Sequence, residues 1–272
     1  MQAANDPSWA IRLFKLSVLK QRKLHEIEGK LGRTEDLECL DIGSDNGVIS
    51  YLLRQRGGTW TSADLNATVV DSIRSLVHER VYQIDGGRTP FAGGTFDRVV
   101  IIDFLEHIPD DAGFLQELHR ILKPDGGLVI NVPHVKKGWL RRLRYALGQT
   151  DEKHGHLRPG YRLEDLRRLL SENFELESAT TYSKFFSELV DTLIVFAVSR
   201  RQKSLKGEAT KGLVVTNEDM RQNQKMLRLY SLIYPFVWFF AKLDGLLFFT
   251  SGYSLIVRAR ACPASQGEAH KT

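Results

Sequence analysis

The sequence feature that most constrains the fold is a glycine-containing turn at residues 41–47, Asp-Ile-Gly-Ser-Asp-Asn-Gly. It separates two different hydrophobic patterns. Residues 37–42 form a short apolar run typical of a strand, whereas the apolar residues from Val48 to Leu53 recur at helical spacing. Glycine permits positive φ and close backbone approach, and the first amides of a helix are ready donors. The turn therefore predicts a strand-to-helix junction that binds a nucleotide-like ligand.

Further strands are predicted over residues 59–64, 81–85 and 96–102, with helical patterns between them. This alternation predicts an α/β fold with a doubly wound, mostly parallel sheet, in which ligands bind beyond the carboxyl ends of the strands. Each of the first four strands ends in an acid: Asp41, Asp64, Asp85 and Asp103. Asp64 lies roughly 20 residues after the turn, the spacing at which such folds hold a ribose. Any one acid has an alternative role as an ordinary helix cap.

The dinucleotide pattern G-x-G-x-x-G fails here, because Asp45 and Val48 stand where glycines are required. The turn instead resembles motif I of the class I S-adenosylmethionine (SAM) dependent methyltransferases, with Asp45 in place of the middle glycine. Asp tolerates left-handed backbone better than most residues. Residues 103–109 resemble the segment after strand four of that family. Residues 118–133 resemble its helix, Leu-Lys-Pro-Gly-Gly turn and fifth strand, with Asp125 replacing the first glycine.

Together the matched stretches, residues 37–133, most resemble the type 11 methyltransferases, which include quinone-methylating enzymes. The resemblance implies a Rossmann-like, seven-stranded methyltransferase fold with an antiparallel closing pair. It also implies SAM as the cofactor, with Asp64 at the ribose and the adenine near Asp85. The expected cofactor-binding residues are Asp41, Gly43, Gly47, Asp64, Asp85 and Asp103.

Methyl transfer from a sulfonium is an in-line displacement, so a general base is needed only when the acceptor must lose a proton. The loop at residues 151–161 contains two histidines, an arginine and a tyrosine, where substrate loops of the resembling family lie. We expect His156 to be the base, with His154 next and His134 and His107 behind it. The alternative is that these are surface histidines that only hydrogen-bond the loop.

The chain divides by pattern into a helical cap (1–36), a SAM-binding core (37–184), a helical insertion (185–250), a closing strand (251–262) and a disordered tail (263–272). One amphipathic helix is expected over residues 8–30, either covering the site or packed on the sheet edge. The insertion is apolar at 185–198, basic at 199–228 and aromatic at 229–250.

The aromatic segment approaches the length of a membrane span, but Lys242 and Asp244 interrupt it. An interfacial helical hairpin fits better, with the basic stretch attracted to anionic lipid. The alternatives are a buried helical pair and a dimer contact. The net charge is +5, but the sequence contains no specific nucleic-acid-binding motif. Two cysteines, Cys39 and Cys262, suggest neither a disulfide framework nor a metal site, so no metal is expected.

The sequence therefore predicts a cytoplasmic, SAM-dependent methyltransferase that contacts the membrane peripherally. The expected reaction is O-methylation of a lipid or lipid-linked glycan, so the partner is a small-molecule or lipid-linked acceptor. Two alternatives stay open: a quinone-type C-methyltransferase, and a SAM-fold binding subunit that has lost catalysis.

Overall fold

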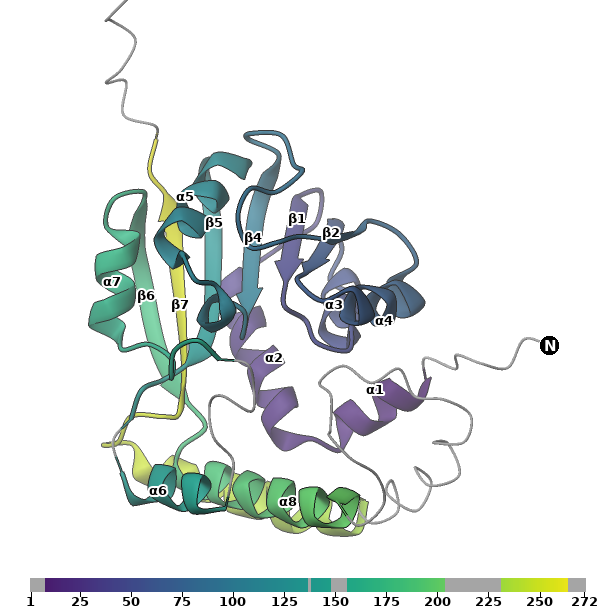
Figure 1. Cartoon of the computed structure of the whole chain (residues 1–272), viewed down its shortest axis with the longest axis vertical. Coiled ribbons are helices and arrows are strands. Elements are labelled where there is room, and N and C mark those ends of the chain that lie inside the picture. The colour runs from purple at the N-terminus through teal and green to yellow at the C-terminus, as the bar shows by residue number, and fades with distance from the viewer. Residues whose placement is uncertain (1–7, 137, 148–155, 204–230, 264–272) are drawn as a thin grey trace, which may run out of the picture.

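The structure is a computed structural model that describes residues 8–136, 138–147, 156–203 and 231–263. Over these residues a seven-stranded sheet has the order β3-β2-β1-β4-β5-β7-β6 (Figure 1). The strands are β1 (Glu38–Ile42), β2 (Thr59–Asp64), β3 (Val81–Gln83), β4 (Phe96–Ile102), β5 (Leu122–Pro133), β6 (Phe174–Tyr182) and β7 (Ser254–Ala261). β1 to β5 pair in parallel, and β7 is antiparallel to both β5 and β6. This confirms the predicted doubly wound sheet with its antiparallel closing pair.

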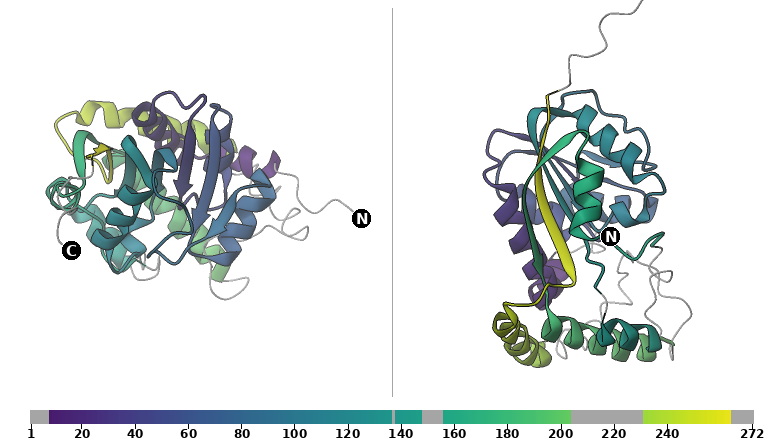
Figure 2. Two further views of the ribbon diagram at one scale, coloured as in Figure 1. Left: turned by 90° about the horizontal axis from the view of Figure 1, so that it is seen from above. Right: turned by 90° about the vertical axis from the view of Figure 1, so that its left-hand side faces the viewer.

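Helices cover both faces of the sheet (Figure 2). The helices of the described residues are α1 (Ser8–Lys15), α2 (Val18–Leu31), α3 (Val48–Arg54), α4 (Ala67–Val77), α5 (Asp111–Ile121), α6 (Trp139–Ala146), α7 (Leu163–Leu170) and α8 (Phe185–Lys203), with short 3-10 helices η1 (Leu105–His107) and η3 (Asp244–Leu247). Residues 231–243 are also helical.

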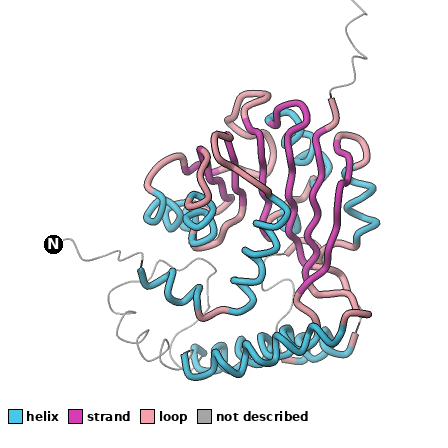
Figure 3. The backbone as a smooth tube through the Cα atoms, turned by 180° about the vertical axis from the view of Figure 1, so that it is seen from behind, coloured by secondary structure: helices cyan, strands magenta, loops and turns pink. Residues whose placement is uncertain are grey.

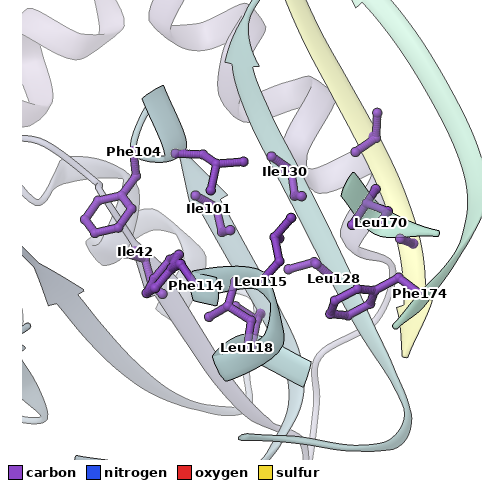
Figure 4. Close-up of a cluster of buried hydrophobic side chains, with 14 of the residues drawn as sticks. Ile42, Ile101, Phe104, Phe114, Leu115, Leu118, Leu128, Ile130, Leu170 and Phe174 are labelled. Carbon is purple, nitrogen blue, oxygen red and sulfur yellow. The ribbon is translucent and has the colours of Figure 1, made fainter. Parts of the chain in front are cut away.

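Alternation along the strands divides the core into two layers. Ile101 packs with α5 and α7, whereas its neighbours Val100 and Ile102 pack with α1, α2 and α3. Figure 4 shows the first layer, in which Phe114 of α5 and Leu170 of α7 lie over the strands. Because successive side chains of a strand point to opposite faces, the apolar run of β4 must be covered on both sides.

The N-terminal segment differs from the prediction of one helix over residues 8–30. The structure has two helices, because the Ser17 side chain accepts a hydrogen bond from the Lys20 backbone N–H at 3.4 Å and begins α2 there. α2 then buries Ile27 and Leu31 fully in the second core layer.

A layer of helices lies across one end of the sheet, and it contains α6 and α8 (Figures 1 and 3). α6 follows the end of β5 and α8 follows the end of β6, so this layer lies on the carboxyl side of the parallel strands. Asp244 joins the layer together, since its carboxylate accepts hydrogen bonds from the backbone N–H groups of Lys184 and Phe186, each at 2.8 Å, at the start of α8.

None of the helices in the described ranges is both long enough and apolar enough to cross a membrane. Predictions for the basic stretch from residue 204 onward, for His154 and for the tail from residue 264 onward lie outside the described residues.

Candidate functional site

The glycine turn is held tightly between neighbouring elements. Gly43 and Gly47 have φ of 84° and 82°, and Asp45 has φ of 56°. A Cβ on Gly43 would lie 2.4 Å from the carbonyl oxygen of Ile102, and one on Gly47 would lie 2.7 Å from the Cα of Ile73. Both glycines are therefore required by φ and by space.

Asp45 keeps the turn in its left-handed conformation without a glycine, as the sequence predicted. Its carboxylate pairs with the ammonium of Lys20 at 3.3 Å, which offsets the negative charge that Asp45 adds beside the turn. Asp125, the other acid that replaces a family glycine, also has a positive φ, of 60°. Both substitutions thus preserve the backbone geometry of the turns that they occupy.

Asp41 lies beneath the turn and has no exposed surface. Its carboxylate accepts hydrogen bonds from the hydroxyls of Ser50 and Ser62, the latter at 2.8 Å, and lies 3.5 Å from the guanidinium of Arg54. Burial raises the pKa of Asp41, and Arg54 and the two serines oppose that shift. The contacts join β1 to α3 and β2, so they give Asp41 a role in fixing the turn from below.

Asp64 and Asp85 lie at two successive turns on the carboxyl side of the sheet. Asp64 ends β2, is 9% exposed and accepts a hydrogen bond from the Asn66 N–H at 3.1 Å. The N-cap of α4 is Asn66, so capping of that helix does not depend on Asp64. Asp85 is exposed, lies two residues past β3 and accepts a hydrogen bond from the Gly87 N–H at 2.8 Å.

Asp103, at the end of β4, belongs to a polar network that also includes residues of α2, β5 and β6. It forms an ion pair with Lys23 of α2 and accepts a hydrogen bond from the Asn131 side-chain amide at 2.9 Å. Asn131 in turn accepts one from the hydroxyl of Tyr182. Burial alone would lower the pKa of Lys23, but Asp103 more than reverses this and the pKa is raised.

Three members of this network were not predicted. Asn131 could have been singled out from the sequence, since it is a polar residue inside the apolar run of β5; in the structure it is fully buried. Lys23 could not have been singled out from the sequence, because 80 positions separate it from Asp103 and its sequence context is that of any basic helix. Tyr182 is nearly fully buried, and burial raises its pKa.

His156 lies in the loop before α7, beside the 3-10 helix that follows β4. Its Nε2 is 3.9 Å from a carboxylate oxygen of Glu106. Its ring packs edge-on against the ring of His107, with the two ring centroids 4.8 Å apart. Glu106 has no exposed surface. The structure therefore brings His156 together with His107, another candidate base, and with Glu106, which the sequence analysis did not single out. The role of His156 as a base stays a prediction.

His134, another candidate base, has a different environment. Its Nδ1 donates to the carbonyl oxygen of Gly252 at 2.8 Å, and its backbone N–H donates to Tyr253 at 2.9 Å. These bonds tie the segment after β5 to the segment before β7. They agree with the alternative that this histidine only forms hydrogen bonds that hold its loop.

The helical layer beside the site presents large apolar side chains to solvent. On residues 231–243, Phe236 is 65% exposed and Phe239 is 56% exposed, and Phe248 after η3 is 83% exposed. Others of the same kind are Leu232, Trp238, Phe240, Leu246 and Phe249. The layer thus forms an apolar surface beside the carboxyl end of the sheet, which we call the aromatic surface.

Comparison with known proteins identifies the core. Residues 40–130 match the family model of the methyltransferase domain. A stretch of 131 residues is 27% identical to the ubiquinone biosynthesis O-methyltransferase of Pseudomonas paraeruginosa and covers 44% of this chain and 52% of that protein. A stretch of 103 residues is 27% identical to the demethylmenaquinone methyltransferase of Tropheryma whipplei and covers 37% of this chain and 43% of that protein.

The chain spans about half the length of the curated relatives that it matches. The geranyl diphosphate C-methyltransferase of Streptomyces coelicolor superposes with a TM-score of 0.53 at 14% identity and covers 89% of this chain and 77% of that one. This likeness concerns the fold alone. With the motif order and the sheet order, the match over residues 40–130 identifies this part of the chain as a class I SAM-dependent methyltransferase domain that is similar to type 11.

Proposed function

We propose that this protein transfers the methyl group of SAM to an oxygen atom of a lipid or lipid-linked acceptor at a membrane face. The observation that carries the proposal is the turn between β1 and α3, where Gly43 and Gly47 are fixed by φ and by space at the carboxyl edge of the sheet. The glycines let the turn take positive φ and pack closely against Ile102 and Ile73 at the edge where the resemblance expects the cofactor.

The acids around the turn suit the charge of SAM. The sulfonium is cationic and the ribose hydroxyls and amino group are donors, so carboxylate acceptors stabilise them. Asp64 and Asp85 lie at successive strand ends and would contact the ribose and adenine side, whereas Asp41 supports the turn from below. Because the sulfonium is already activated, the main task of the site is to align the acceptor. His156 promotes removal of the acceptor proton.

The turn geometry supports an active enzyme over a lapsed binding subunit. Asp45 and Asp125 depart from the family glycines, but both have the positive φ that the turns need. Asp45 therefore gives the turn between β1 and α3 the positive φ that a glycine would have, and the paired Lys20 offsets its charge. Asp125 lies near the amino end of β5, at the opposite edge of the sheet.

The aromatic surface supports a membrane location. A helix that lies in the interface places aromatic and aliphatic side chains at headgroup level and basic residues toward anionic lipid. Here Lys242 lies 5.2 Å from the ring centre of Trp238, and α6 contributes Arg141 and Arg142 to the same layer. An apolar, lipid-like acceptor would then reach the site from the bilayer side.

A quinone-type acceptor is the second candidate. It is favoured by the two relatives, which are named for ubiquinone biosynthesis and for demethylmenaquinone. Such an acceptor is also apolar and fits the same surface. Mass spectrometry of membrane extracts from a deletion strain distinguishes a missing methyl ether on a lipid or glycan from an altered quinone.

SAM binding is tested by isothermal titration of the full chain and of Asp64→Ala. Loss of charge-assisted hydrogen bonds should cost about 1.5–3 kcal/mol, or at least about tenfold in affinity. Asp71→Ala is the control, because Asp71 is an exposed acid on α4 that pairs only locally with Arg74 at 2.8 Å. Unchanged affinity in folded Asp64→Ala would refute the site assignment, and absence of SAM binding by the folded wild type would support the lapsed subunit.

The membrane location is tested by sedimentation with liposomes that contain anionic lipid. We expect the wild type to sediment, and replacement of Trp238, Phe239 and Phe240 by serine to release it with SAM affinity unchanged. Tyr82→Ser, which changes an exposed aromatic residue on β3, is the control. Recovery of the wild type in the supernatant at low salt would show that the aromatic surface serves another contact.

A further inference from the structure

Asn131 of β5 holds Asp103 by two hydrogen bonds. The backbone N–H of Asp103 donates to the carbonyl oxygen of Asn131, and the Asn131 side-chain amide donates to the Asp103 carboxylate, each at 2.9 Å. Asp103 has a φ of 45°, in the left-handed region that residues with a side chain adopt rarely. Such a conformation persists only where the surrounding structure enforces it. The two bonds to Asn131 therefore fix both the backbone and the side chain of Asp103.

The Tyr182 hydroxyl decides which end of the Asn131 amide faces Asp103. It donates to the amide oxygen, so the amide nitrogen is left to face the carboxylate. A reversed amide would set two acceptor oxygens against each other. Asn131 has no exposed surface and Tyr182 is 2% exposed, so solvent does not replace a missing partner readily. Burial also raises the pKa of Tyr182, so the hydroxyl keeps the proton that it donates.

The fixed carboxylate of Asp103 remains partly accessible beside the glycine turn. One of its oxygens accepts from Asn131 and the other pairs with Lys23, yet the side chain is 33% exposed. The residues on either side of it approach the turn closely. A Cβ on Gly43 would lie 2.4 Å from the carbonyl oxygen of Ile102 and 2.8 Å from the Cβ of Phe104. Asp103 is thus presented to solvent next to the first glycine of the turn.

The strand order indicates which part of the cofactor Asp103 would meet. β3, β2, β1 and β4 are successive neighbours in the sheet. In the proposed function Asp85 and Asp64 contact the adenine and the ribose at the ends of β3 and β2, and the glycine turn follows at β1. A cofactor that continues in this direction places its amino-acid part at the end of β4. The ammonium group of that part is a cation, which a fixed carboxylate stabilises by charge-assisted hydrogen bonds.

We propose that Tyr182 and Asn131 are positioning residues for the cofactor: Tyr182 orients the Asn131 amide, and the amide aims the Asp103 carboxylate at the ammonium group of SAM. The inference rests on the proposed function, because it takes SAM to lie at this edge. Both residues act through Asp103. Since Tyr182 is the last residue of β6, cofactor affinity depends on the antiparallel closing pair as well as on the strands that carry the turn.

The test compares two ligands of the full chain that differ in the amino-acid part. S-adenosylhomocysteine has the same amino-acid part as SAM and transfers no methyl group, whereas 5′-methylthioadenosine lacks that part. The first is titrated calorimetrically, and the second is measured by its displacement of the first. Tyr182→Phe should weaken S-adenosylhomocysteine about fivefold and Asn131→Leu at least about tenfold, as expected for one neutral and one charge-assisted hydrogen bond. Both variants should bind 5′-methylthioadenosine as the wild type does.

Two further comparisons separate positioning from a general loosening of the fold. Trp60→Phe is the matched control, because Trp60 lies in the same core layer as Tyr182 and its buried ring N–H donates to the carbonyl oxygen of Gly57 at 3.0 Å. It should leave the ratio of the two affinities unchanged. Asp103→Asn should itself weaken S-adenosylhomocysteine selectively. Asn131→Leu added to Asp103→Asn should then have little further effect, because residues that act through one group are not additive.

The outcomes separate the inference from the proposed function. Equal weakening of both ligands by Tyr182→Phe and Asn131→Leu would overturn the inference and show that the two residues only stabilise the fold. Unchanged affinity for S-adenosylhomocysteine in both folded variants would overturn it as well, as would full additivity with Asp103→Asn. In each case the wild type would still bind SAM and the proposed function would stand. A folded wild type that binds neither SAM nor S-adenosylhomocysteine would instead refute the proposed function.

Discussion

Asp41 provides the sharpest test of how the glycine turn is supported, and Asp41→Ala is the informative change. The substitution removes the acceptor for Ser50 and Ser62 and the charge partner of Arg54. Truncation of one member of a buried ion pair costs about 3–5 kcal/mol. Arg54 keeps its hydrogen bonds to the carbonyl oxygens of Ser50 and Trp60, at 3.0 and 3.1 Å, so we expect a loss near about 3 kcal/mol.

The measurement is urea unfolding followed by circular dichroism, together with thermal melting. At 2–4 °C per kcal/mol for a domain of this size, the melting temperature should fall by roughly 6–12 °C. Because burial raises the pKa of Asp41, its ionised form costs stability above the folded-state pKa, and that cost is relieved as the pH falls through it. Asp41→Asn, which resembles the protonated acid, should therefore lose less stability than Asp41→Ala.

The reasoning would be refuted by a folded Asp41→Ala protein that loses less than about 1 kcal/mol, well below the cost of a broken buried pair. A simultaneous large loss of SAM affinity would then assign Asp41 to direct cofactor contact. A large loss of stability, with SAM affinity preserved in the folded fraction, would confirm its role as an anchor.

The remaining predictions concern the turn and the N-terminal helices. Gly43→Ala should cost roughly 2–4 kcal/mol in urea unfolding, from left-handed strain and from the clash with Ile102, whereas Gly29→Ala on α2, with nothing within 4 Å, should be neutral or stabilising. Equal effects would contradict the close approach. Lys23→Met should increase hydrogen exchange in α2 and cost about 1 kcal/mol, since the pair with Asp103 is partly exposed. Because the pKa of Lys23 is raised, the stability difference between the wild type and Lys23→Met is fully present below about pH 10.4 and is lost as the pH rises through the folded-state pKa. A stability difference that persists above that pKa would argue against the ion pair.

The sequence predicted the sheet well because its signals were local. The period changes at Gly43 and Gly47, and the apolar runs of β4 and β5 mark buried parallel strands. β3 was shorter than predicted, since it ends at Gln83 and leaves Asp85 in the following turn. β3 has one buried residue followed by two exposed ones, so its apolar pattern gives a weak boundary signal, and the glycines beyond it do not fix where pairing stops.

The site was predicted only in outline. The acids at the strand ends were found, but the difference between Asp41, which is fully buried, and Asp85, which is exposed, depends on side chains from other elements. The same holds for Lys23 beside Asp103 and for His156 beside Glu106. These contacts join residues 50 to 80 positions apart, and no periodicity in the sequence encodes such pairs.

The position at which the helical layer leaves the sheet has an evolutionary consequence. Tyr182 at the end of β6 pairs directly with Ser254 at the start of β7, and Asp244 closes the base of the intervening segment onto Lys184. The two ends of the segment are thus adjacent before any of its helices are added, and the entropy of closing a longer loop grows only slowly with length. Exchange of this segment between homologues would change the surface that the protein presents beside the sheet. The register of the strands would stay the same.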